Sequence, residues 1–208
     1  MKIIRLVIIS FVLFVIPFSA SFASNYSYSY LGLTLSGVYL DQPIIFNDYK
    51  FDRLGGALIV GSYQFIDKFS VFYNYSRRGA ESCNREANVT ENIGAFGFKF
   101  INSVDSTDMN IGFASLNTET ELCVDPICTK GDDSGKRLMF EVRHMVNKTT
   151  EFNLLVKRDN FDIADDYATL GFGVAFYFYN HHSVRINFTN NSNSDKSAEL
   201  GYLYSFGS

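Results

Sequence analysis

Three cysteines carry the most reactive side chains of this chain, and their spacing predicts a disulfide. Cys83 lies in one segment without strand periodicity, whereas Cys123 and Cys128 lie together in another. In an exported protein the surroundings are oxidising, so we expect Cys123 and Cys128 to close a small loop around residues 124–127. Closing this short loop costs less chain entropy than pairing either residue with the distant Cys83 would. Pairing of Cys83 with Cys123 or Cys128 stays open as the alternative, because three thiols always leave one over.

Acidic side chains gather in two segments that also lack strand periodicity. They are Glu119, Glu121, Asp125, Asp132 and Asp133 in the first, and Asp159, Asp162, Asp165 and Asp166 in the second. Hard cations such as Ca²⁺ take several carboxylate oxygens, but no spacing here matches a calcium-loop signature. A zinc site would need more ligands, and no histidine accompanies the cysteines. We therefore expect no metal site and no cofactor, and we interpret the acids as solvated.

The histidines, His144, His181 and His182, lack the neighbours that catalysis requires. Nucleophilic catalysis needs an oriented base beside a nucleophile, and the sequence shows no such arrangement. Near the C-terminus, Asn190-Asn191-Ser192-Asn193 is similar to the His-x-Ser-Asn motif of outer-membrane lipid A deacylases. Asn190 stands where that family has histidine, and an amide cannot act as a general base. We expect no enzyme, with a lipid A hydrolase as the weaker alternative.

The N-terminal segment has the order of a secretory signal peptide. Lys2 and Arg5 come first, an apolar run over residues 6–18 follows, and small residues end at Ala23. This order predicts a signal peptide over 1–23 and one mature domain over 24–208. No later apolar run is long enough for a transmembrane helix, so the exported chain could span a membrane only as a closed sheet.

Composition narrows the class of protein further. The 208 residues include 21 Phe and 13 Tyr, with 19% charged residues and a formal net charge of −4. The aromatic content is too high for a disordered chain. Nucleic-acid binding is not expected, because phosphate contacts require clustered Lys and Arg.

Alternating polarity along the mature chain predicts β-strands whose two faces meet different surroundings. In 168–178, Leu170 and Phe172 share one face, whereas Thr169, Gly171 and Gly173 share the other. The same alternation recurs in about ten segments, namely 31–36, 59–65, 70–76, 93–100, 108–113, 137–143, 152–157, 168–178, 184–189 and 198–206. The connections alternate in length, with short turns at 66–68, 103–107, 147–150 and 180–182 and long loops at 37–53, 77–91, 117–136, 159–165 and 190–196.

This pattern predicts an all-β fold, a transmembrane antiparallel up-and-down β-barrel of about ten strands. Eight strands is the alternative, if 37–63 or 184–206 is irregular. A soluble sandwich or lipocalin-like barrel would carry exposed Lys and Glu on its polar face. Here the polar face is rich in Gly, Ser, Asn and Thr and the apolar face is aromatic, which favours a membrane barrel.

The chain resembles small Gram-negative outer-membrane barrels of the broad OmpA/OmpX type. The resemblance rests on the signal peptide, the opening Tyr30-Leu31-Gly32-Leu33 and the closing Gly201-Tyr202-Leu203-Tyr204-Ser205-Phe206. In that family the barrel usually ends on an aromatic residue, whereas Gly207 and Ser208 follow here. The resemblance implies that the protein is a monomer in the bacterial outer membrane. It would contact lipid and lipopolysaccharide there and be inserted by the barrel assembly machinery.

The polar faces would bring a charge cluster into the lumen of so narrow a barrel. Its members are Lys99, Glu141, Arg143, Lys157, Arg185 and Glu199. If these charges pair with one another, the barrel interior is either filled by side chains or crossed by a thin path of water. We therefore expect a non-enzymatic role in envelope integrity, adhesion or interaction with an extracellular ligand through surface loops, with a narrow small-solute channel as the alternative.

Overall fold

The structure, a computed structural model, describes residues 28–82, 86–179 and 181–206. Ten strands follow one another there: β1 (Tyr30–Phe46), β2 (Tyr49–Ile66), β3 (Phe69–Glu81), β4 (Ala87–Val104), β5 (Thr107–Val124), β6 (Ile127–Asn147), β7 (Thr150–Phe161), β8 (Tyr167–Phe178), β9 (His182–Asn191) and β10 (Lys196–Ser205). The predicted signal peptide and Cys83 lie outside the described residues. Among those residues, no helix is long and apolar enough to cross a membrane.

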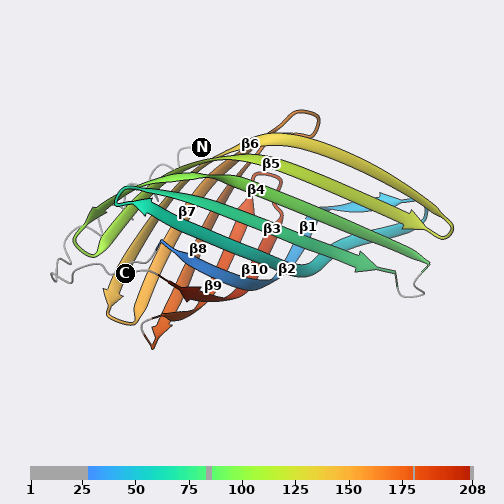
Figure 1. Cartoon of the computed structure of the whole chain (residues 1–208). Helices are drawn as coiled ribbons and strands as arrows, with labels where there is room; N and C mark the ends of the chain where they lie inside the picture. The colour runs from blue at the N-terminus through green and yellow to red at the C-terminus, as the bar shows by residue number, and fades with distance from the viewer. Residues whose placement is uncertain (1–27, 83–85, 180, 207–208) are drawn as a thin grey trace.

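The strands form a closed antiparallel barrel in which each strand pairs with its sequence neighbours (Figure 1). β1 and β10 close the ring, with Tyr30 opposite Ser205. The prediction of a ten-stranded up-and-down barrel is therefore confirmed. Because the strand number is even, the described chain starts and finishes at one end of the barrel. We call this the terminal end and the opposite one the hairpin end.

The two faces of the barrel wall differ as the alternation predicts. On β4, Phe96 and Phe98 face outward and are more than half exposed, whereas Ala95, Gly97 and Lys99 face inward and are buried. At the terminal end His182 packs against Phe178, Tyr202 and Tyr204 on the outer wall. Apolar wall residues with an aromatic rim are what a lipid-facing surface requires.

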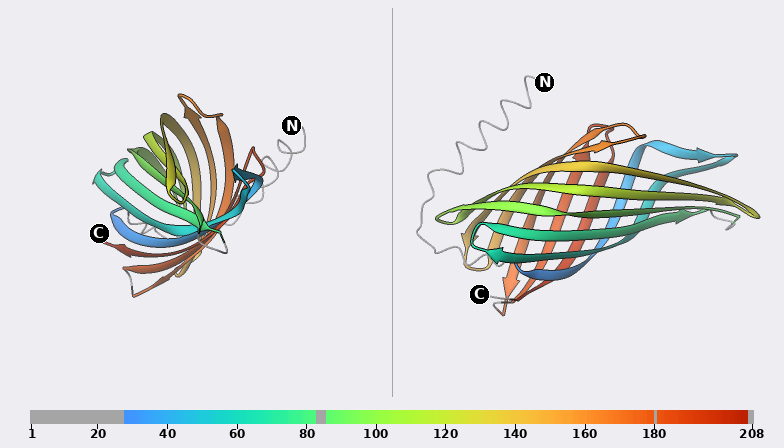
Figure 2. Two further views of the ribbon diagram at one scale, coloured as in Figure 1. Left: turned by 90° about the vertical axis from the view of Figure 1, so that its right-hand side faces the viewer. Right: turned by 45° about the horizontal axis from the view of Figure 1, so that its top comes forward.

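The long loops predicted at 37–53, 77–91 and 117–136 are wrong, because these segments continue the strands. β1 and β2 meet at a tight turn after Phe46, and β5 and β6 pair up to Val124 and Ile127. Together, residues 38–54, 79–82, 86–92 and 116–136 extend the sheet on one side of the barrel, and we call this extension the arm. Figure 2 shows its long hairpins reaching beyond the shorter β7–β10 strands, and β6 has 21 residues where β10 has 10.

The arm has its own apolar core, and this explains why the sequence concealed it. Phe51, Leu54 and Val89 are buried there, with Leu40 and Leu122 packed against them. These residues point to the inner side of the sheet, whereas the apolar residues of the barrel wall point outward. The polarity of the alternation therefore inverts along the same strands, as expected where the outer surface passes from lipid into water.

Gly97→Ala is expected to destabilise the barrel, because β4 and β5 approach each other too closely for a Cβ. A Cβ at Gly97 would overlap the Phe113 carbonyl oxygen and lie 2.6 Å from Ala114 Cα. Backbone must then move, at a cost of about 1–3 kcal/mol. Urea unfolding in lipid vesicles measures the change. Gly37→Ala is the matched control, since a Cβ there meets nothing within 4 Å, and equal unfolding midpoints for the two variants would contradict the prediction.

Candidate functional site

The lumen is closed near the terminal end by a buried cluster of charged and aromatic side chains. Arg143 Nε and Nη2 donate to the two carboxylate oxygens of Glu151, over 3.0 and 2.7 Å. Arg143 Nη2 also donates to Tyr177 Oη over 2.9 Å, and Arg185 Nη2 lies 3.4 Å from Glu151 Oε1. The Glu151 side chain is 0% exposed. One carboxylate therefore holds two cations from β6 and β9 against β7.

Tyr28 completes this closure from the segment that precedes the first strand. It precedes β1, is 3% exposed, and donates from its hydroxyl to Asp108 Oδ2 (2.7 Å) and Asn110 Oδ1 (3.0 Å). The Arg143 guanidinium lies 5.0 Å from the centre of its ring. We call Tyr28, Asp108, Asn110, Arg143, Glu151, Tyr177 and Arg185 the basal cluster. It joins the N-terminal segment to β5, β6, β7, β8 and β9 across the lumen.

Further ion pairs line the lumen above the basal cluster. Lys99 Nζ lies 3.1 Å from Glu141 Oε2, which also accepts from Asn110 Nδ2 over 3.2 Å. Nearer the hairpin end Arg137 donates to both oxygens of Asp159, over 2.6 and 2.7 Å. Two longer pairs accompany it there, Lys157 with Asp159 at 3.9 Å and Arg78 with Glu199 at 3.6 Å. The lumen charges are thus arranged in levels along the barrel axis.

A cavity of about 530 Å³ occupies the lumen above the basal cluster. Lys99, Glu141 and Arg185 line its floor, whereas Asp165 and Asp195, from the turns at the hairpin end, line its rim. The cavity is therefore a cup that opens at the hairpin end. Four buried side-chain atoms of its lining lack a hydrogen-bond partner among the described residues, namely Arg78 Nε, Asn153 Nδ2, Arg185 Nε and Asn187 Oδ1.

The structure places all six residues of the predicted charge cluster in the lumen but does not gather them at one point. Lys99, Glu141, Arg143 and Arg185 lie toward the terminal end, and Lys157 and Glu199 lie nearer the hairpin end. The acidic residues that pair with the arginines and lysines of this cluster were not all predicted. Glu151 and Asp159 continue the inward positions of β7 by two residues on either side of 153–157, so extending the alternation would have found them. Nothing in the sequence pattern marked Tyr28.

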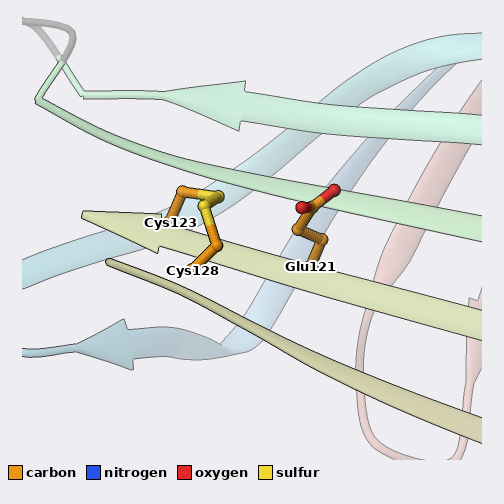
Figure 3. A group of neighbouring side chains, drawn as sticks. All are labelled: Glu121, Cys123 and Cys128. Atoms are coloured by element: carbon orange, nitrogen blue, oxygen red, sulfur yellow. A yellow bond between two sulfur atoms is a disulfide. The ribbon is translucent and has the colours of Figure 1, made fainter. Parts of the chain in front are cut away.

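The disulfide joins Cys123 and Cys128 across the end of the β5–β6 hairpin, with a Cα–Cα distance of 4.1 Å. Figure 3 shows Glu121 on the same side of the hairpin as the two cysteines. These three residues come close enough together to hold an ion, but the sulfur atoms are bonded to each other. Lys130 lies 3.4 Å from Glu121, which raises the pKa of the Lys130 ammonium group. The oxidised tip therefore has an ion pair where a metal would need free ligands.

The loop between β7 and β8 is held against the arm by Asp133 and by Ser134, whose carbonyl oxygen accepts the Asp162 N–H over 2.8 Å. Asp133 accepts backbone N–H groups from Ala164 (2.8 Å), Ser134 (2.7 Å) and Ile163 (3.2 Å). These bonds, with that of Ala164 the strongest, lower the pKa of Asp133, which lies in the arm. The loop presents the Ile163 side chain, 83% exposed, on an ordered support.

Acidification is expected to loosen residues 163–164 of this loop. A carboxyl whose pKa is lowered in the folded state stabilises docking above its ordinary pKa of about 3.9, and the contribution is lost as the pH falls through the lowered value. Asp133→Asn should loosen these two residues at every pH, since a neutral amide accepts their N–H groups more weakly than a carboxylate does. Amide NMR shifts of Ile163 and Ala164 from pH 6 to pH 2 test both statements. Asp132→Asn should leave the transition in place, and a flat profile for the unchanged chain would refute the prediction.

The three histidines lie far from Ser192, the serine of the deacylase-like stretch. Ser192 Oγ accepts the Ala168 N–H at the hairpin end, over 3.1 Å. His144 Nδ1 lies 2.8 Å from Thr107 Oγ1, and His181 and His182 contact Tyr204, all at the terminal end. The arrangement therefore lacks the base that a lipid A hydrolase of that kind would need beside its serine.

Comparison with known proteins identifies the architecture. No protein-family model matches the chain, and no curated protein matches its sequence. Among solved structures, the translocator domain of the autotransporter NalP from Neisseria meningitidis has a TM-score of 0.50 at 10% identity, covering 88% of this chain and 90% of that one. The fold is that of an outer-membrane β-barrel.

Two other outer-membrane barrels give lower scores. The attachment invasion locus protein Ail of Yersinia pestis is 10% identical with a TM-score of 0.47, over 85% of this chain and 95% of that one. The outer membrane protein OprG of Pseudomonas aeruginosa is 10% identical with a TM-score of 0.45, over 90% and 100%. At these scores and identities, neither structure says anything about the role of this chain.

Proposed function

We propose that this chain is a monomeric, integral outer-membrane protein that presents its arm at the cell surface for non-enzymatic adhesion or interaction. It would be exported by a signal peptide over 1–23 and inserted by the barrel assembly machinery, with the mature barrel over 24–208. The arm carries the proposal. A membrane anchor alone needs strands of ~9–11 residues, whereas β4, β5 and β6 have 18, 18 and 21.

The build of the arm supports a role in recognition. Its core ties three hairpins together, and Tyr49 Oη donates to Glu86 Oε2 over 2.7 Å between the first two. A preorganised surface loses less conformational entropy on binding than a mobile loop does. The tips present Ile45 and Ile127, which are 70% and 67% exposed, beside charged residues. Apolar side chains held in a polar setting are typical of sites where proteins bind partners.

Surface labelling tests the orientation of the barrel. Lys130→Cys places a thiol in the arm and Thr149→Cys places one in a turn of the terminal end, each on a background with Cys83, Cys123 and Cys128 replaced by Ser. On intact cells a membrane-impermeant maleimide should label the first variant and spare the second. Lysis should expose both. Labelling of Thr149→Cys on intact cells would show that the barrel has the opposite orientation.

Adherence of bacteria that display the protein tests the role of the arm. In one variant an Asn-Gly turn replaces residues 118–133, which removes the tip of the β5–β6 hairpin. Adherence to epithelial cells and to lipopolysaccharide-coated surfaces should fall to the level of cells without the protein. The control shortens the β9–β10 turn at 192–195, outside the arm. Equal adherence of the two variants would remove the arm from the proposed function.

A narrow solute channel is the second candidate, because a cavity lies in the lumen. The basal cluster opposes it, since its buried side chains lie across the lumen below that cavity.

A further inference from the structure

The cup in the lumen has one aliphatic wall and one polar wall. All three lining residues of β2, Leu54, Leu58 and Val60, are aliphatic, and Val38 and Leu40 of β1 continue the same surface. Barrel interiors that only hold water are polar. Leu54 is buried, but the other four residues are half-buried and offer apolar surface that a ligand could cover favourably.

The polar wall lies across the lumen from the aliphatic one. In the ring of ten strands β7 is five strands from β2 in either direction, and β6 is equally far from β1. The inward charges Lys157 of β7 and Arg137 of β6 line the same cavity and therefore lie on the opposite side of the ring from the aliphatic wall. Thr169, on the strand beside β7, adds a hydroxyl to this side of the cup.

Lys157 is the least compensated cation of this wall. Both oxygens of Asp159 already accept from Arg137, over 2.6 and 2.7 Å, whereas Lys157 Nζ lies 3.9 Å from Asp159 Oδ2. The two cations thus share Asp159, and Glu199, the other acid near them, pairs with Arg78 over 3.6 Å. The Lys157 side chain is 22% exposed and lines the cavity, so its ammonium group is accessible to an anion entering the cup.

We propose that the cup binds an amphipathic carboxylate, whose apolar body lies on the β1–β2 wall and whose carboxylate pairs with Lys157. The volume of about 530 Å³ is in the range of ~300–1,000 Å³ found for small-molecule sites. Access is from the hairpin end, because the basal cluster closes the other end. Val38, Leu40 and Leu54 of its aliphatic wall belong to the arm, but they line the lumen and not the tips of the hairpins, so this inference does not depend on the proposed adhesive role.

Calorimetric titration of the full mature barrel in lipid nanodiscs tests the proposal, with sodium octanoate as the probe and empty nanodiscs as the blank. Octanoate should bind saturably at one site per barrel. Octylammonium has the same chain with the opposite charge, and glucuronate has a carboxylate without an apolar body. Each should bind at least about tenfold more weakly than octanoate. Equal binding of octylammonium, or of glucuronate, would overturn the proposal.

Two variants test which wall of the cup binds the carboxylate and which binds the alkyl chain. Lys157→Met should weaken octanoate at least about tenfold while leaving octylammonium unchanged or stronger. Leu58→Asn should weaken both alkyl probes. Lys136→Met, on the outer side of β6, is the matched control and should bind octanoate as the unchanged chain does. Heat-dependent gel mobility verifies that each barrel is folded, and a folded Lys157→Met barrel with full octanoate affinity would refute the site.

Discussion

Glu151→Ala is expected to destabilise the barrel by about 3–5 kcal/mol, the cost of leaving buried cations without their partner. Arg143 and Arg185 both pair with this carboxylate, and their side chains are 5% and 15% exposed. Tyr177 Oη donates to Glu151 Oε2 over 2.5 Å and would also lose its acceptor. The acids nearby have partners of their own, Glu141 in Lys99 and Asn110 and Asp108 in Tyr28. The urea concentration at half-unfolding in lipid vesicles, followed by heat-dependent gel mobility, measures the loss.

A surface pair provides the comparison for this variant. Asp52 and Arg53 lie 3.9 Å apart with largely exposed side chains, so Asp52→Ala should change stability by no more than about 1 kcal/mol. The double variant Glu151→Leu with Arg143→Met should recover part of the loss, because apolar replacement removes a buried charge together with its partner. If Glu151→Ala and Asp52→Ala unfolded at the same urea concentration, the basal cluster would contribute nothing to stability.

The barrel could be predicted from the sequence because its two faces meet solvents of opposite polarity along every strand. On β4 the large apolar residues Phe96, Phe98 and Phe100 alternate with the small residues Ala95 and Gly97. This alternation predicts that the phenylalanines face lipid, and in the structure they face outward. The number of alternating segments then gave about ten strands, although three of the five long connections predicted between them are themselves strand. A mean hydropathy of +0.00 hides this pattern, since outward and inward residues cancel in an average.

The arm could not be predicted from the same signal, because both faces of its sheet meet water except over a small core. Along β5 the apolar residues switch from outward Phe113 to inward Leu116 and Leu122. A register shift between Tyr39 and Ile44 breaks the period in β1 as well. Alternation over a few residues indicates which face of a strand is apolar. Where the apolar residues switch from one face to the other, the alternation is interrupted and the segment resembles an irregular loop.

The sequence could predict which residues line the lumen but not which of them contact each other. Inward charges follow from parity along each strand, so Lys99, Glu141 and Lys157 could be assigned to the lumen. Which of them meet depends on how strands several positions apart in the ring face each other, and that depends on the stagger of the closed sheet. The opposition of Lys157 to the aliphatic β2 wall required the ring order itself.

Tyr28→Ala is expected to open the terminal end of the barrel to ions. Tyr28 is the one member of the basal cluster that no strand contributes, and its side chain occupies the space between Arg143 and the pair Asp108 and Asn110. Removing the ring vacates that space and leaves two buried acceptors without their donor, which favours entry of water. In planar lipid bilayers the unchanged barrel should show no discrete single-channel steps, whereas Tyr28→Ala should show them.

Two further variants separate the ring from its hydroxyl group and from general damage to this end. Tyr28→Phe keeps the ring over Arg143 but removes the donor to Asp108, so its conductance should lie between those of the unchanged barrel and Tyr28→Ala. Tyr204→Ala removes an outward tyrosine of the same end and should leave the lumen closed. A Tyr28→Ala barrel without single-channel steps would mean that Tyr28 is not needed for closure. Steps in the unchanged barrel as large as those of Tyr28→Ala would mean that the basal cluster does not close the lumen. The channel function would then become the stronger candidate, because the cup would continue through the barrel as a pore.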